Sequence, residues 1–149
     1  MSFDPATFLN QTIEEANDTK VTPCPAGEYV ALAEKVEIKP WSARDGSSSG
    51  LKVEIVWDIQ DDNVKSLLGK DTVRVRQQQM LDLTETGALD LGKGKNVGLG
   101  RLREAVDLNT PGSPFAFTMI QGRIAKVKVS HRVNGEDIYD EIKAVTKAA

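Results

Sequence analysis

The sequence predicts a mostly β fold, all-β with accessory helices. Apolar and polar residues alternate along five stretches, turn-forming residues separate most of these stretches, and only two segments carry apolar residues at helical spacing. The 149 residues, 40% of them apolar and 28% charged, suffice for one core and are too few for two large ones. We therefore expect a helix and linker over residues 1–22 and one folded domain over residues 23–149.

The first segment is predicted to be a short helix. Asp4 can accept hydrogen bonds from the first free amides, and Pro5 suits the first helical position. An apolar stripe begins at Phe8 and continues through Ile13 and Ala16. Residues 22–27 hold two prolines and a glycine, so they are expected to form a linker into the sheet.

Residues 27–41 and 51–58 are predicted to form the first two strands. Glu34 interrupts the alternation of the first strand, which indicates a bulge or a bend. The stretch SARDGSSSG between the two strands has the composition of a hairpin loop. Asp61-Asp62-Asn63 is expected to turn the chain out of the second strand.

The remaining elements are one helix and three strands. Residues 71–83 alternate as a third strand, and a Gly-rich connection over 84–95 follows. Leu99, Leu102 and Val106 then recur at helical spacing. The fourth and fifth strands are expected over 122–133 and 138–145, with Asn134-Gly135 as the hairpin turn between them.

This order of elements is strand, strand, strand, helix, strand, strand. It is the order of a five-stranded OB-type Greek-key barrel, β-β-β-α-β-β, here preceded by the short N-terminal helix. In such barrels, one sheet face and its adjoining loops commonly bind oligonucleotides. Strand order does not by itself define a function, so individual side chains have to be weighed.

The sequence lacks the residue sets that are typical of catalysis and metal binding. The only histidine, His131, ends a strand, and the only cysteine, Cys24, stands between two prolines at no ligand-like spacing from it. Residues 87–94 imitate a phosphate-binding GxxxxGK loop, but Gly94 stands where Ser or Thr would bind magnesium, and Asp90 would repel phosphate. We expect a protein that is not an enzyme and that needs no cofactor and no metal.

Cys24 has no partner for a disulfide within the chain, which fits a reducing compartment. The N-terminus does not have the pattern of a secretory signal, and no apolar run approaches the roughly 18 residues of a membrane span. A cytoplasmic location without membrane contact is therefore expected, the host cytoplasm if the protein belongs to a phage.

The net charge of −3 is unevenly distributed. Residues 1–28 carry one Lys and five acids, whereas residues 93–132 carry eight Lys or Arg and two acids. Long cationic side chains at alternating strand positions can follow a phosphate backbone, although the same pattern also occurs on a solvated sheet face. The cationic candidates for nucleic-acid contact are Arg44, Lys52, Arg74, Arg76, Lys93, Lys95, Arg101, Arg123, Lys126, Lys128 and Arg132.

Aromatic residues are few, but proteins that bind single strands use them to stack bases. Trp41, at the end of the first strand, and Tyr29 and Tyr139, within strands, are the candidates for stacking. Ordinary packing is the alternative for each of them and is slightly favoured for the two tyrosines. Trp57 shares the apolar parity of the second strand and is expected in the core. Phe115 and Phe117 are expected to close one end of the barrel.

Three segments, PAGEYVALAEKVEI, GKNVGLGRLREAVDLN and GRIAKVKVSHRVNGEDIYDEIKAV, resemble a group of phage-encoded single-stranded-DNA-binding proteins. The resemblance covers about residues 23–146 and rests on loose patterns. It implies an OB-fold protein that coats exposed DNA in phage replication or recombination. The binding role would then belong to Arg74, Arg76, Lys126 and Lys128, with Trp41 or Tyr139 stacking. The chain departs from bacterial-type single-strand binders because it ends in lysines and alanines and not in an acidic tail.

The first functional hypothesis is thus sequence-tolerant binding of single-stranded DNA, with replication or recombination proteins, or a second copy of the chain, as further candidate partners. The alternative is a structural or assembly role in the virion, for which the N-terminal helix and the Pro-rich linker would suit a docking arm. A small enzyme that uses only carboxylates is a third, less favoured, hypothesis.

Overall fold

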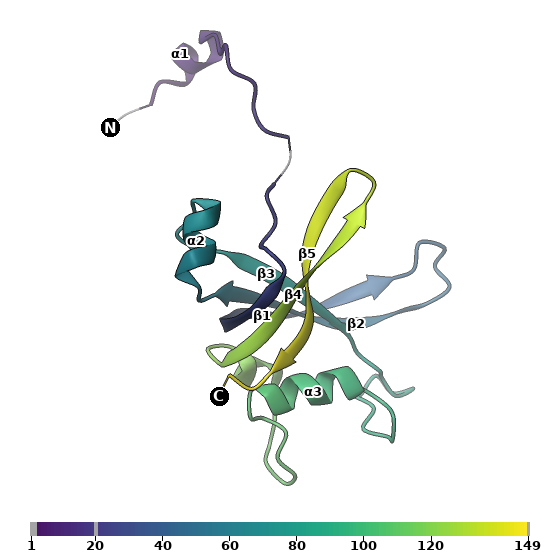
Figure 1. Cartoon of the computed structure of the whole chain (residues 1–149). Coiled ribbons are helices and arrows are strands. Elements are labelled where there is room, and N and C mark those ends of the chain that lie inside the picture. The colour runs from purple at the N-terminus through teal and green to yellow at the C-terminus, as the bar shows by residue number, and fades with distance from the viewer. Residues whose placement is uncertain (1–2, 20, 149) are drawn as a thin grey trace.

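The computed structural model describes residues 3–19 and 21–148. Most of the regular structure is β: five antiparallel strands form one open sheet in the order β3-β2-β1-β4-β5 (Figure 1). The strands are β1 (Gly27–Ser42), β2 (Ser49–Ile59), β3 (Arg74–Met80), β4 (Ile124–Asn134) and β5 (Asp137–Thr146). All five expected strands are present, and the strand that precedes the Gly-rich connection is shorter than predicted.

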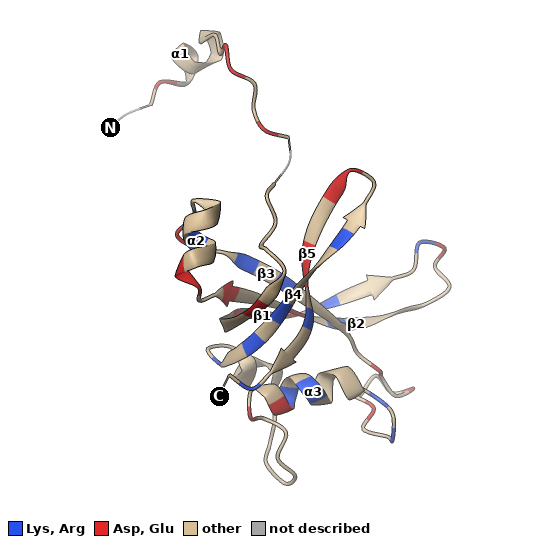
Figure 2. Ribbon diagram, in the orientation of Figure 1, with Lys and Arg blue, Asp and Glu red and all other residues tan. Residues whose placement is uncertain are grey.

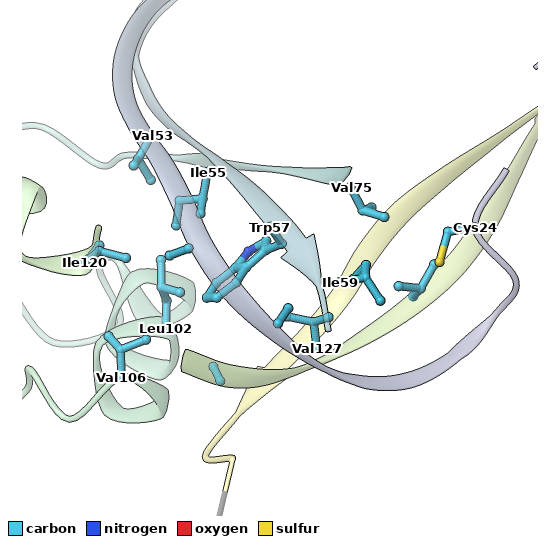
Figure 3. Close-up of a cluster of buried hydrophobic side chains, with 14 of the residues drawn as sticks. Cys24, Val53, Ile55, Trp57, Ile59, Val75, Leu102, Val106, Ile120 and Val127 are labelled. Atoms are coloured by element: carbon cyan, nitrogen blue, oxygen red, sulfur yellow. The ribbon is translucent and has the colours of Figure 1, made fainter. Parts of the chain in front are cut away.

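The alternation of the sequence is confirmed by burial on one face of the sheet. Val53, Ile55 and Trp57 of β2 point inward together with the alternate residues Ala125, Val127 and Val129 of β4. Trp57 is fully buried among apolar side chains, as expected (Figure 3). Its indole N–H donates to Gln77 Oε1 at 2.8 Å, so its polar atom is satisfied inside the core. Full burial of a large apolar side chain contributes about 1.5–3 kcal/mol, which makes this face the main source of stability.

The predicted irregularity at Glu34 is a bulge. The pairing of β1 with β2 shifts register between Ala33 and Lys35. The extra residue bends β1, so its first part pairs with β4 while its last part forms, with β2, a hairpin that extends from the sheet (Figure 1).

One helix was not expected. The turn predicted at residues 61–63 is the start of α2 (Asp62–Leu68), where the Asp61 side chain accepts from the Val64 amide and Gly69, at φ 63°, ends the helix. Only Val64 of this helix is buried, so no apolar stripe announces it in the sequence. The order is therefore β-β-α-β-α-β-β and not β-β-β-α-β-β.

The second predicted helix is α3 (Val97–Ala105), which buries Leu99 and Leu102 against the inner face of the sheet. Asn96, at φ 52°, holds the start of α3 to the preceding loop. Its side-chain amide accepts from the Asp82 N–H and donates to the carbonyls of Asp82 and Asp90, and its backbone N–H donates to the Asp82 carboxylate, all at 2.8–2.9 Å. The Gly-rich connection is thereby tied to the helix at both ends. A short 3-10 helix, η1 (Phe117–Ile120), leads into β4.

The first helix, α1 (Pro5–Asn10), begins as predicted, with Asp4 accepting from the Ala6 amide at 3.0 Å. It ends sooner than the apolar stripe suggests, because Ile13 and Ala16 lie in irregular chain. Every described residue from 3 to 19 is exposed, and α1 stands away from the sheet (Figure 1). No helix formed by the described residues has the length and apolar character needed to cross a membrane.

Candidate nucleic-acid interface

The outward side of the sheet carries the strand cations that were predicted to bind nucleic acid. Because β2 and β1 lie between β3 and β4, the cations of β3 and β4 do not form one continuous stripe. Arg74 and Arg76 lie at one end of the sheet, and Lys126 and Lys128 lie toward the other. The two groups have different surroundings, so each is described by itself.

Arg74 and Arg76 lie among acids on the outward face of β1, β2 and β3. Arg74 donates to both carboxylate oxygens of Glu34, at 2.6 and 3.1 Å, and these hydrogen bonds hold the pKa of Glu34 below its ordinary value. Arg76 lies 3.9 Å from Glu54, a carboxylate that is only 6% exposed. The two arginines are therefore partly neutralised by the protein itself.

Glu54 is the centre of this charged network. Lys39 donates to it at 3.0 Å and Gln78 at 3.3 Å, and the bond to Glu54 raises the pKa of Lys39. Glu37 in turn pairs with Lys35 at 2.6 Å and with Lys39 at 3.4 Å, which lowers the pKa of Glu37. The predicted contact residue Lys52 donates to Gln78 at 3.0 Å. We call the surface formed by Glu34, Lys35, Glu37, Lys39, Glu54, Arg74 and Arg76 the paired face; a hollow of about 620 Å³ lies among these residues.

The outward side of β4 has a different character. Lys126, Lys128 and Arg132 alternate with buried Ala125, Val127 and Val129, so the three cations share the outward side, as the sequence parity predicts. Lys126 lies opposite Val30 of β1 and Thr146 of β5. We call these three cations the β4 stripe.

The β4 stripe has fewer acidic neighbours than the paired face. In residues 3–19 and 21–148, no carboxylate lies within ion-pair distance of Lys126 or Lys128, although Glu28 is the cross-strand neighbour of Lys128. Arg132 forms an ion pair with Glu141 at 3.9 Å, the same separation as that of Arg76 and Glu54. The two lysines are thus available to an external anion.

Tyr139 lies at the Arg132 end of the β4 stripe. It is the cross-strand partner of Arg132, whose guanidinium lies 5.5 Å from the centre of the tyrosine ring. The ring is 44% exposed. An exposed ring next to a row of cations is the arrangement on which an unpaired base can stack while its phosphates contact the lysines.

Trp41 and Arg44 lie on the hairpin between β1 and β2. Trp41 lies across Gly50, its cross-strand partner, and a Cβ added to Gly50 would stand 3.0 Å from the indole nitrogen. This contact half-buries Trp41 and leaves its indole N–H without a partner in the described structure. Arg44 is exposed in the loop. Tyr29 packs against the core and donates to the Pro25 carbonyl at 2.8 Å, in keeping with the packing interpretation.

The other predicted cations lie away from the β4 stripe in the fold. Lys93 and Lys95 are exposed in the loop before α3, and Arg123 is exposed just before β4. Arg101 of α3 lines a groove of about 480 Å³ between β3, α3 and β5. This groove also contains Lys143 and Lys147, which were not among the sequence candidates because only the fold brings the C-terminal lysines next to α3.

His131 and Cys24 have a structural role. His131 Nε2 lies 2.7 Å from the Cys24 carbonyl, and the Cys24 amide donates to Asp140 at 2.8 Å, so the linker is held to the hairpin of β4 and β5. Burial raises the pKa of the Cys24 thiol to about 11, with Asp140 adding to the shift, so the thiol stays protonated at neutral pH. The described residues contain no cluster of three or more side chains that could hold a metal ion.

Phe115 and Phe117 pack edge to face, with their ring centres 5.3 Å apart, and lie partly buried against the core, with the Arg103 guanidinium over the Phe115 ring.

Comparison of the chain with protein-family models and with curated protein sequences gave no match.

Proposed function

We propose that this chain is a non-enzymatic, sequence-tolerant binder of single-stranded DNA, and that the β4 stripe and Tyr139 form the binding surface. The observation that carries the proposal is the combination of two lysines that form no ion pair within residues 3–19 and 21–148 and an exposed aromatic residue on one outward strand surface. Alternate residues of a strand are about 6.6–6.8 Å apart, so Lys126 and Lys128 are neighbours on the outward side, and Ser130 separates them from Arg132. Such a group of cations attracts a phosphate backbone without reading its sequence.

The proposal includes a fold of the OB type. In the strand order β3-β2-β1-β4-β5, with every pair antiparallel, β3 and β5 are the two edge strands. An OB-type barrel would close where these two strands meet. Residues of β3 and β5 approach within 8 Å between Cα atoms, and α3 lies beside β5. The hairpins after β1 and β4 would then be the two loops that commonly flank an oligonucleotide in this fold, and they carry Trp41 and Tyr139.

The resemblance of three segments to phage-encoded single-stranded-DNA-binding proteins supports the same proposal. It points to a role in phage replication or recombination, in the cytoplasm of the host. The acids of the paired face do not contradict binding, because they pair with the cations of that face and lie apart from the β4 stripe.

A binding titration with three ligands tests the proposal. Fluorescence anisotropy would follow a labelled oligo-dT, a duplex of the same length and the matching RNA at several salt concentrations. We expect the single-stranded DNA to bind best, with log K falling against log salt at a slope of about −2, because three cations contribute about −0.7 each. If a long oligo-dT does not bind at low salt, the proposal is wrong.

A further inference from the structure

The N-terminal arm, residues 3–19, is the largest exposed apolar segment that the binding proposal leaves unexplained. Phe8 is 62% exposed, Leu9 84% and Ile13 77%. The arm carries four acids, Asp4, Glu14, Glu15 and Asp18, and neither lysine nor arginine. Exposed apolar side chains gathered in one segment mark an interaction site more often than solvated chain.

The helix of this arm is already formed. Asp4 accepts from the Ala6 amide at 3.0 Å and from the Thr7 hydroxyl at 2.9 Å, so α1 has its N-terminal cap without help from the sheet. The capped turn presents Phe8 and Leu9 to solvent. The arm is thus prepared to bind a surface that combines apolar contacts with positive charge.

The groove between β3, α3 and β5, which we call the seam groove, has these two properties. Its cations are Arg101, Lys143 and Lys147, and Glu104 is the one acid among its lining residues. The exposed Ala144 and the half-buried Val145 contribute apolar surface to the same groove. The seam groove therefore matches the arm both in charge and in apolar character.

The arm and the seam groove lie at opposite ends of the molecule. The linker that bears the arm is fastened at Cys24 to the β4–β5 hairpin by Asp140 and His131. The seam groove is formed at the other end of β5, next to the C-terminus and α3 (Figure 1). Figure 2 shows the acids along the arm and the cations on α3 and the strands near it. An arm that leaves one end of a copy can reach the opposite end of the next copy.

We propose that the N-terminal arm of one copy docks in the seam groove of a second copy. The contact is head-to-tail, so it continues from copy to copy and does not close into a symmetric dimer. If the proposed function is correct, successive copies would lie along one strand of DNA and bind it cooperatively. The contact itself needs no DNA, so it can be tested without any assumption about nucleic-acid binding.

Sedimentation velocity of the full chain, at rising protein concentration and low salt without DNA, tests the contact. We expect species larger than a monomer for the wild type and association weaker by about tenfold or more for Phe8→Glu/Leu9→Glu, because both side chains would lose their apolar burial. The matched control is Leu67→Glu, an exposed leucine on α2 (72%) outside the arm and the groove, which should associate as the wild type does. Circular dichroism of each variant checks that the sheet is intact.

Charge exchange identifies the occupant of the groove. Glu14→Lys/Glu15→Lys/Asp18→Lys leaves Asp4 as the one acid of the arm and makes the arm basic, and Lys143→Glu/Lys147→Glu makes the groove acidic, so each variant alone should stay monomeric. An equimolar mixture should associate again, because each arm then meets a groove of opposite charge. A monomeric wild type, unchanged association of Phe8→Glu/Leu9→Glu, or a mixture that fails to associate would each overturn the proposal. Loss of oligo-dT binding with association intact would count against the proposed function and leave this contact standing.

Discussion

The paired face and the β4 stripe carry the same types of cation on the same side of one sheet, but they differ in what those cations contact. On the paired face, Arg74 is held by Glu34, and Lys39 and Arg76 surround the buried Glu54. On the β4 stripe, the neighbours of Lys126 are Val30 and Thr146, and Glu28 lies opposite Lys128 without an ion pair between them. Arg132 has Glu141 at 3.9 Å, so the uncompensated charge of the stripe belongs to its two lysines. The comparison teaches that a row of cations is a candidate phosphate site only where the cross-strand neighbours leave its charge uncompensated.

The largest expected effect comes from removing the charge of the β4 stripe. For Lys126→Gln/Lys128→Gln we expect the affinity for oligo-dT at 0.1 M salt to fall about 25-fold, because each phosphate contact accounts for about fivefold at that salt concentration. The slope of log K against log salt should become shallower by about 1.4. Fluorescence anisotropy measures both quantities.

The matched control is Lys65→Gln/Lys70→Gln, which makes the same change of charge in and after α2. Its affinity should stay within about twofold of the wild type, since long-range charge effects are screened at this salt concentration. Equal losses in the two double variants would mean that net charge, and not the β4 stripe, determines binding.

Tyr139 is expected to have the next largest effect. Tyr139→Ala should weaken oligo-dT binding by at least about fivefold, since base stacking on an aromatic ring contributes about 1–3 kcal/mol. Tyr139→Phe keeps the ring and should bind nearly as the wild type does. The same titration tests both variants, and a Tyr139→Phe variant as weak as Tyr139→Ala would contradict a stacking role.

A smaller effect of opposite sign is expected on the paired face. Glu34→Gln removes the carboxylate that holds Arg74, so Arg74 becomes available to phosphate and the affinity should rise by up to about fivefold at 0.1 M salt. Arg74→Gln should change the affinity by less than about twofold, because in the wild type this arginine is already paired. A large loss of affinity in Arg74→Gln would show that the paired face binds DNA directly.

The smallest effect is a dependence of stability on pH. The Arg74 hydrogen bonds lower the pKa of Glu34 from its ordinary 4.5 in the folded chain, so the pair stabilises the fold above pH 4.5 and this contribution is lost as the pH falls through the folded-state pKa. Chemical denaturation of the wild type and Glu34→Gln over a pH series from 7 downward should show a small difference in the free energy of unfolding that shrinks below pH 4.5. A difference that does not change with pH would mean that the substitution acts through something other than this charge.

Much of the local structure follows from the residue pattern. The alternation in β2 predicts that Trp57 is buried, and the spacing of Leu99 and Leu102 predicts the buried side of α3. The cap at Asp4 is also predictable, because it depends on residues within one helical turn. The helix α2 was missed because its single buried residue, Val64, leaves no periodic signal.

The candidate site was predictable only in part. The shared outward side of Lys126, Lys128 and Arg132 follows from the two-residue period of a strand. The sequence does not reveal that Arg74 is paired, because its partner Glu34 is 40 residues away and meets it only through the order of β1, β2 and β3. Lys143 and Lys147 likewise become part of a groove only when β5 lies beside α3.

The sequence by itself determined which residues form strands, which side of each strand is apolar and where the basic half of the chain lies, because these properties depend on near neighbours. Only the tertiary structure decided which cations are compensated, since cross-strand partners are set by strand order and register. The same holds for His131, which fastens a linker 107 residues away in the chain. Electrostatic character thus depends on long-range contacts, whereas secondary structure and burial are largely local.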